Sequence, residues 1–126
     1  MGQQQLLLIV LGVIVVGIAV VVGINLFTAN AVSANRDGVV ADLTNLGTMA
    51  QEYYRKPTAM GGGGYTFTGW SIVGTKLDTT PNGVYVPTVA AQSITIVGTG
   101  NEKNGATAIK HTATVTSTAI TIVKTN

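Results

Sequence analysis

The chain has 126 residues, a formal net charge of +2 and no cysteine. The lack of cysteine excludes disulfide bonds and thiolate metal sites. The seven basic residues are scattered along the sequence, so they form no cationic cluster of the kind that binds nucleic acid. The first ionisable side chain is Arg36, and every side chain before it is uncharged.

The N-terminal segment is apolar without interruption. Every residue from Leu6 to Ile24 is Leu, Ile, Val, Ala or Gly. As a helix this run rises about 28 Å, close to the roughly 30 Å hydrocarbon core of a bilayer. A helix that is apolar on all sides must contact lipid or other protein, so we expect residues 3–27 to span a membrane or pack in the core of an assembly. The side chains expected in that packing are Leu6, Leu7, Ile9, Val10, Val13, Ile14, Val16, Ile18, Val20, Val21, Ile24 and Phe27.

A cleaved signal peptide is an alternative interpretation of this start. Small residues at Ala29–Ala31 and at Val32–Ala34 resemble cleavage sites. Two features oppose the interpretation: no Lys or Arg precedes the apolar run, and the run is longer than the usual apolar region of a signal peptide.

The helical pattern continues to Lys56, but its character changes near Asn25. Apolar residues in residues 28–56 recur at steps of three, four and seven, which places them on one side of a helix. We expect this side to pack against a sheet through Val32, Val39, Leu43, Leu46 and Tyr53. Pro57 disfavours helix at Lys56, so the helix should end there. Residues 57–64 include four consecutive glycines and are interpreted as a flexible linker.

Residues 65–126 carry β signals. Alternating residues at 65–68, 70–73, 84–86 and 93–97, and in the tail at 106–115 and 118–124, predict antiparallel strands with threonine on a solvated face. The strand at 93–97 is expected to end at Gly98, and Asn82–Gly83 and Asn104–Gly105 are turn dipeptides. The predicted fold class is α+β: a long N-terminal helix, first apolar and then amphipathic, packed against a small antiparallel β-domain.

No residue pattern predicts catalysis, so we expect no enzyme activity. His111 is the only histidine, and we place it on the sheet surface, because without Cys or a second His it cannot build a typical zinc or nucleophile site. Gly61–Gly64 lacks the Gly-Lys-Ser/Thr of a phosphate-binding loop. We expect no metal, cofactor, small-molecule substrate or nucleic-acid partner. The carboxylates, each interpreted as a solvated charge, are Asp37, Asp42, Glu52, Asp78 and Glu102.

The arrangement of residues 1–56 resembles the N-terminal helix of type IV pilins. Met1-Gly2-Gln3 is similar to a minimal prepilin leader of the archaeal pilin and archaellin type, with Gly before a polar residue and an apolar stretch. The resemblance implies cleavage between Gly2 and Gln3, with residues 1–2 as leader. The sequence departs from the bacterial pattern, because the leader has no Lys or Arg and the usual acidic residue near the mature N-terminus is replaced by Gln5 or Leu7.

The resemblance implies a structural subunit of an extracellular helical filament that serves adhesion, motility or surface contact. Its partners would be copies of itself, the cytoplasmic membrane before assembly, and the platform and motor proteins of the family. Two alternatives remain open at this point. One is a single-pass, membrane-anchored β module that binds a partner, and the other is a minor pseudopilin of a secretion system.

Overall fold

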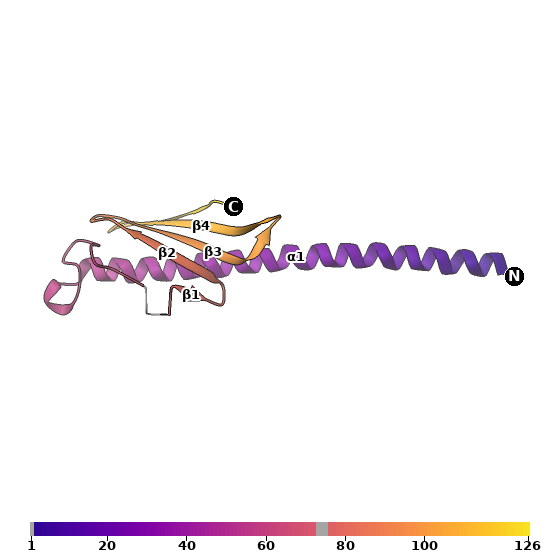
Figure 1. Ribbon diagram of the computed structural model, residues 1–126, viewed down its shortest axis with the longest axis horizontal. Helices are drawn as coiled ribbons and strands as arrows, with labels where there is room; N and C mark the ends of the chain where they lie inside the picture. Colours follow the sequence, from indigo (N-terminus) through magenta and orange to yellow (C-terminus); the bar gives the residue numbers. More distant parts are fainter. Residues whose placement is uncertain (1, 73–75) are drawn as a thin grey trace. The chain divides into compact units, whose positions relative to one another are not determined.

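The computed structural model describes residues 2–72 and 76–126. The chain divides into two compact units, Met1–Ala31 and Val32–Asn126. The predicted fold class is confirmed, because one long helix, α1 (Gly2–Arg55), is combined with an antiparallel five-stranded sheet (Figure 1).

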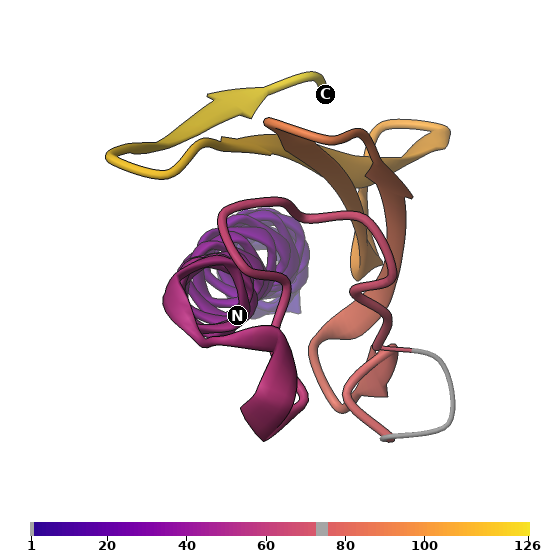
Figure 2. The same ribbon diagram turned by 90° about the vertical axis from the view of Figure 1, so that its left-hand side faces the viewer.

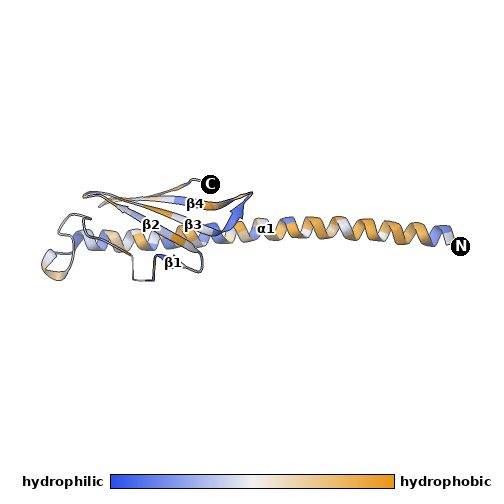
Figure 3. Ribbon diagram, in the orientation of Figure 1, coloured by the Kyte–Doolittle hydropathy of each residue, from blue (hydrophilic) through white to orange (hydrophobic). Residues whose placement is uncertain are grey.

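The first unit consists of the N-terminal half of α1. Its described residues are all helical, and all but Ala31 are exposed. Apolar residues occupy every side of the helix in this unit, whereas apolar and polar residues alternate around it after Val32 (Figure 3). Helix propensity favours this conformation only in part, because glycines at 12, 17 and 23 each weaken a soluble helix by about 1 kcal/mol relative to Ala.

The second unit contains the rest of α1 and a meander of five strands in the order β1-β2-β3-β4-β5. The strands are β1 (Thr79–Thr80), β2 (Gly83–Val89), β3 (Ile94–Asn104), β4 (Thr107–Val115) and β5 (Ile120–Lys124). Each strand pairs antiparallel with the next one along the chain. Short connections between sequence neighbours explain why turn dipeptides at Asn82–Gly83 and Asn104–Gly105 were sufficient to locate two of the turns.

The core of this unit lies between one side of α1 and the inner face of the sheet. Viewed along the helix, strands β2 to β5 curve around one side of the second half of α1 (Figure 2). Alternate residues of β3 and β4 point inward, which gives both strands an alternating pattern of burial. The buried apolar side chains are Val39, Leu43, Leu46, Ala50, Phe67, Trp70, Ile72, Tyr85, Ile94, Ile96, Ile109, Ala113 and Val115.

The outer face of the sheet is formed by threonine and valine. The register pairs Thr88 with Thr95, Thr95 with Thr114, and Thr114 with Thr121, so four threonines form one row across β2 to β5. The neighbouring row consists of Val86, Val97, Thr112 and Val123. Such β-branched residues favour strands, and their exposure is consistent with the solvated face that the alternation predicts.

Residues Tyr65–Ile72 correct one strand prediction. Their alternation predicts strands at 65–68 and 70–73, but the structure has turns and irregular backbone from Tyr65 to Ile72, and Val73 lies outside the described residues. Tyr65 has φ 65° and Gly69 has φ 92°, both in the left-handed region that a strand excludes. Phe67 and Trp70 are nevertheless buried, so their apolar character serves core packing rather than strand formation.

β3 extends further than the sequence predicts. Gly98 was the expected end of this strand, yet β3 continues to Asn104 and pairs with β4 as far as the Asn104–Thr107 pair. A side chain at Gly98 would lie 3.0 Å from the Tyr85 ring and from Val39, so glycine at this position permits close packing instead of ending the strand.

The glycine-rich segment after α1 is held by hydrogen bonds rather than loosely connected. A 3₁₀ turn (Thr58–Met60) follows Pro57, and the backbone N–H groups of Gly62, Gly63 and Gly64 donate to the carbonyls of Pro57, Tyr53 and Lys56. The bond to Tyr53 satisfies a carbonyl in the last turn of α1 that lacks a partner within the helix, and the other two bonds fix the residues that follow α1. Gly63 is buried, and a Cβ there would collide with the carbonyl oxygen of Thr66.

Candidate functional site

The apolar segment Leu6–Phe27 is the most unusual surface of the chain. Seventeen large apolar side chains of this segment are exposed. The twelve that the sequence predicts to pack in an assembly are all among them, with exposed fractions from 54 % at Ile14 to 76 % at Phe27. A monomeric soluble protein seldom exposes a contiguous apolar surface of this extent.

Helix α1 contains a stretch that is long and apolar enough to cross a membrane, and none of that stretch is buried within the chain. A signal sequence near an N-terminus meets the same criterion. The segment is therefore compatible with membrane insertion. Its side chains provide no hydrogen-bonding group other than at its polar ends, so its chemistry is limited to apolar contact with lipid or with another apolar surface.

Gly2 and Gln3, the residues on either side of the predicted processing bond, lie in the first turn of α1 and are exposed. Met1 lies outside the described residues. The first N–H groups of any helix lack a partner within the helix, and Gln3 to Gln5 place amide side chains in this turn.

The residues predicted to join α1 to the sheet lie on the buried side of the helix. Val39 and Leu43 are 0 % exposed and Leu46 is 2 % exposed, whereas Val32 and Tyr53 are half-buried at the edges of the same cluster. Their steps of seven, four, three and seven bring all five to one side of α1.

Asp42 joins α1 to the sheet by hydrogen bonds, a role that the sequence alone does not predict. One of its carboxylate oxygens, Oδ2, accepts hydrogen bonds from Tyr85 Oη at 2.5 Å, Thr80 Oγ1 at 2.7 Å and Asn82 Nδ2 at 3.1 Å. Burial alone would raise the pKa of Asp42, but these three donors outweigh it and lower the pKa. Asp42 is thus a half-buried attachment point of β1 and β2 on α1 and not the solvated charge that the sequence suggests.

Two further residues of α1, Asn35 and Arg36, form hydrogen bonds with the β-domain. Asn35 donates from Nδ2 to the carbonyl of Asn82 at 2.7 Å and accepts from the N–H of Glu102 at 3.1 Å. Arg36 donates from Nη1 to the backbone oxygen of Asn126 at 2.6 Å. With Asp42, these residues attach the second half of α1 to β1, β2, β3 and the segment after β5, which fixes the helix against the sheet by polar as well as apolar contacts.

The position of His111 corrects a second expectation. The sequence places it on the sheet surface, but it is 6 % exposed and lies on the inner face with Ile109, Ala113 and Val115. Its Nδ1 is buried with no hydrogen-bond partner in the described part of the chain. Burial first, and then the positive charges of Arg36 and Lys124, lower the pKa of His111, so the neutral imidazole is favoured. The period-2 alternation was the signal that could have found it.

Within residues 2–72 and 76–126, no group of three or more His, Asp or Glu side chains is placed to hold a metal ion. The apolar segment therefore remains the candidate site. The chain matches no protein-family profile, no curated protein and no solved structure at a significant level.

Proposed function

We propose that this chain is a structural, pilin-like subunit of an extracellular helical filament that polymerises through the apolar segment Leu6–Phe27. The observation that carries the proposal is the contrast within α1. One half exposes seventeen large apolar side chains, and the other half is covered by the chain's own sheet. A plain membrane anchor needs only the first half, since a single span takes about 20 residues.

The apolar segment can supply the free energy for assembly. Burial of a large apolar side chain from water stabilises by about 1.5–3 kcal/mol, so the seventeen side chains of this segment supply on the order of 25–50 kcal/mol in gross terms. Association costs an estimated ~4–15 kcal/mol in lost freedom of the subunit. In a bilayer the same side chains gain little from association, because lipid tails are equally apolar. Subunits can therefore be stored in the cytoplasmic membrane and remain permanently bound once the filament leaves it.

Small residues on one side of the apolar segment support close contact between helices. Gly12, Ala19 and Gly23 are separated by seven and four residues, which returns each to nearly the same side of a helix. A Cβ added at Gly12 or Gly23 would meet nothing within 4 Å among residues 2–72 and 76–126. Small residues at such spacing allow two helix backbones to approach each other.

Electron microscopy of the full chain tests the proposal. The chain is purified in detergent, the detergent is removed, and negatively stained samples are compared with those of two variants. Val16→Asp places a charge in the proposed filament core, and we expect it to abolish fibres. Val123→Asp makes the same change at a similarly exposed position on β5, 56 % against 62 %, and should leave fibres intact.

Fibres at normal yield from Val16→Asp would contradict the proposal. So would a monodisperse wild-type chain that only partitions into lipid vesicles, because that behaviour is expected of the membrane-anchored β module. A minor pseudopilin would appear as short, low-yield assemblies that need another subunit, and abundance in native surface material distinguishes it from a major filament subunit.

A further inference from the structure

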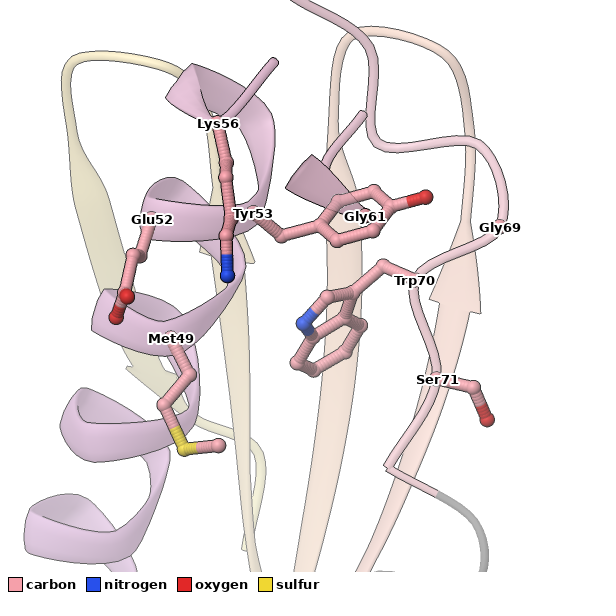
Figure 4. Close-up of a pocket in the computed structure, with 8 residues that line it drawn as sticks. All are labelled: Met49, Glu52, Tyr53, Lys56, Gly61, Gly69, Trp70 and Ser71. Atoms are coloured by element: carbon pink, nitrogen blue, oxygen red, sulfur yellow. The ribbon is translucent and has the colours of Figure 1, made fainter. Parts of the chain in front are cut away.

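A pocket of about 350 Å³ lies where α1 ends, within the second unit (Figure 4). This volume is at the small end of the range for ligand sites. The last two turns of α1 form one wall, Gly69–Ser71 forms the other, and the turn at Gly61 closes one end. The lining residues are Met49, Glu52, Tyr53, Lys56, Gly61, Gly69, Trp70 and Ser71.

We call this cavity the Trp70 pocket. Backbone hydrogen bonds and one hydrogen bond from the Tyr53 side chain hold both of its walls in place. Tyr53 Oη donates to the carbonyl of Thr68 at 2.9 Å, which joins α1 to the opposite wall. The N–H of Gly63 donates to the carbonyl of Tyr53 at 2.8 Å, and the N–H of Trp70 donates to the carbonyl of Phe67 at 3.0 Å. The pocket is therefore formed before any ligand binds, which reduces the ordering cost of binding.

Two N–H donors reach the same space inside the pocket. The side chains of Lys56 and Trp70 both direct their nitrogen atoms into the space between α1 and Gly69–Ser71, whereas the Tyr53 hydroxyl and the Glu52 carboxylate point away from it (Figure 4). Trp70 is only 8 % exposed. Within the described part of the chain, neither its indole N–H nor the Lys56 ammonium has a hydrogen-bond or ion-pair partner.

The apolar part of the pocket lies beside the two donors. It consists of the Met49 thioether, the Tyr53 ring and the Trp70 ring, and Glu52 and Ser71 complete the lining (Figure 4). Two donors, one of them a cation, are complementary to an acceptor that carries negative charge and has two oxygens. The apolar surfaces of Met49, Tyr53 and Trp70 fit an aliphatic or aromatic body next to that group.

We propose that the Trp70 pocket binds a small organic carboxylate, with Lys56 Nζ and Trp70 Nε1 as donors to the carboxylate and Met49, Tyr53 and the Trp70 ring in contact with its apolar body. No sequence motif predicts a small-molecule site here, because Lys56 and Trp70 are brought together only by the turn after α1. The proposal does not depend on filament formation, since all lining residues belong to the second unit.

Trp70 provides the readout, because it is the only tryptophan of the chain. The full chain in detergent is titrated with phenylacetate, and the Trp70 fluorescence is recorded. Phenylacetamide has the same body without the charge, and glucuronate tests whether a sugar acid is accepted in place of an aromatic acid. We expect saturable binding of phenylacetate with a Kd of about 1 mM, and binding of phenylacetamide about tenfold weaker.

Lys56→Gln and Lys103→Gln form the matched pair of variants. Lys56→Gln should weaken phenylacetate about tenfold and remove the preference for acid over amide, because it deletes the cationic donor. Lys103→Gln removes an exposed cation of β3 and should leave the titration unchanged. Equal titration by acid and amide, an absent signal for all three compounds, or an unaffected Lys56→Gln variant with wild-type thermal stability would each overturn the proposal.

Discussion

The two halves of α1 use glycine for different purposes. In Val32–Arg55, a Cβ at Gly38 would collide with the Asn82 side chain, and a Cβ at Gly47 would lie 2.9 Å from Ile120. Both glycines are thus explained by the close approach of the chain's own sheet. In Gly2–Ala31, a Cβ at Gly12, Gly17 or Gly23 would meet nothing within 4 Å in the part of the chain that the structure describes.

Polar residues differ between the halves in the same way. Asn35, Arg36 and Asp42 all bind backbone or side chains of the sheet, whereas no charged side chain precedes Arg36. The second half is a helix whose partner is present within the chain. The first half has an apolar surface and small residues that no contact in the described part of the chain explains, as expected if the proposed filament packing supplies its partner.

The largest expected difference between the two halves of α1 is in how much a Leu→Ala substitution lowers the free energy of unfolding. Leu43→Ala removes a fully buried side chain and should lower the free energy of unfolding by about 2–5 kcal/mol. Leu11→Ala makes the same change at a position 56 % exposed and should have almost no effect on the detergent-solubilised monomer. Urea unfolding followed by Trp70 fluorescence measures both. Equal losses would show that the first half is also packed within the monomer.

A second, smaller effect concerns Asp42. Its folded-state pKa is lowered, so its carboxylate stabilises the fold above the unfolded pKa of about 3.9, and that stabilisation is lost as the pH falls through the folded-state pKa. Asp42→Asn should cost about 1–3 kcal/mol at pH 7 through weaker hydrogen bonds, and it should flatten the acid limb of the stability curve. Unfolding free energies from pH 7 to pH 2 measure this. An equally steep acid limb in the variant would assign it to another carboxylate.

The periodic features of this fold were predictable from the sequence, and its long-range contacts were not. Steps of three and four identified the side of α1 that Val39, Leu43 and Leu46 share, and period-2 alternation identified β3 and β4. Asp42 could not be placed, because its donors lie 38 to 43 residues away on β1, β2 and their turn. The residues next to Asp42 in the sequence would look the same if its side chain were solvated.

Tyr65–Ile72 and His111 show two opposite errors. At Tyr65–Ile72 the alternation was accepted as a strand although a left-handed residue at Gly69 breaks the extended backbone. At His111 the alternation with Ile109, Ala113 and Val115 indicates the inner face, and the lack of Cys or a second His excludes a typical metal site without placing the residue on the surface. Neither the Trp70 pocket nor the Thr88–Thr95–Thr114–Thr121 row could be predicted, because both depend on which strands and turns become neighbours.

The glycine comparison gives a third prediction, with effects of about 1 kcal/mol. Gly47→Ala should lower the free energy of unfolding by roughly 1 kcal/mol, since crowding against Ile120 and Val115 exceeds the gain in helix propensity. Gly23→Ala should leave monomer stability unchanged or raise it by up to about 1 kcal/mol. If close helix contacts form the filament, Gly23→Ala should also reduce fibre yield by microscopy. A stabilised monomer with unchanged fibres would exclude a close contact at this position.

The last effect concerns His111, and near pH 7 it should be the smallest, because the imidazole is then largely neutral in both the folded and the unfolded chain. Its folded-state pKa is lowered by burial and by Arg36 and Lys124, so the unfolded chain binds the proton more readily. The free energy of unfolding is therefore at its maximum above the unfolded-state pKa of about 6.5. It falls as the pH decreases toward the folded-state pKa, by at most about 1.4 kcal/mol per pH unit. His111→Gln keeps a polar side chain but does not titrate, so the difference between pH 7.5 and pH 5 should shrink in this variant. Histidine NMR shifts report the same proton directly, and a folded-state pKa above 6.5 would reverse the sign. Arg36 binds the backbone oxygen of Asn126, and Lys124 pairs with His111 in the register. A protonated imidazole would therefore add a third positive charge beside β5. We expect local unfolding at low pH to begin at this strand.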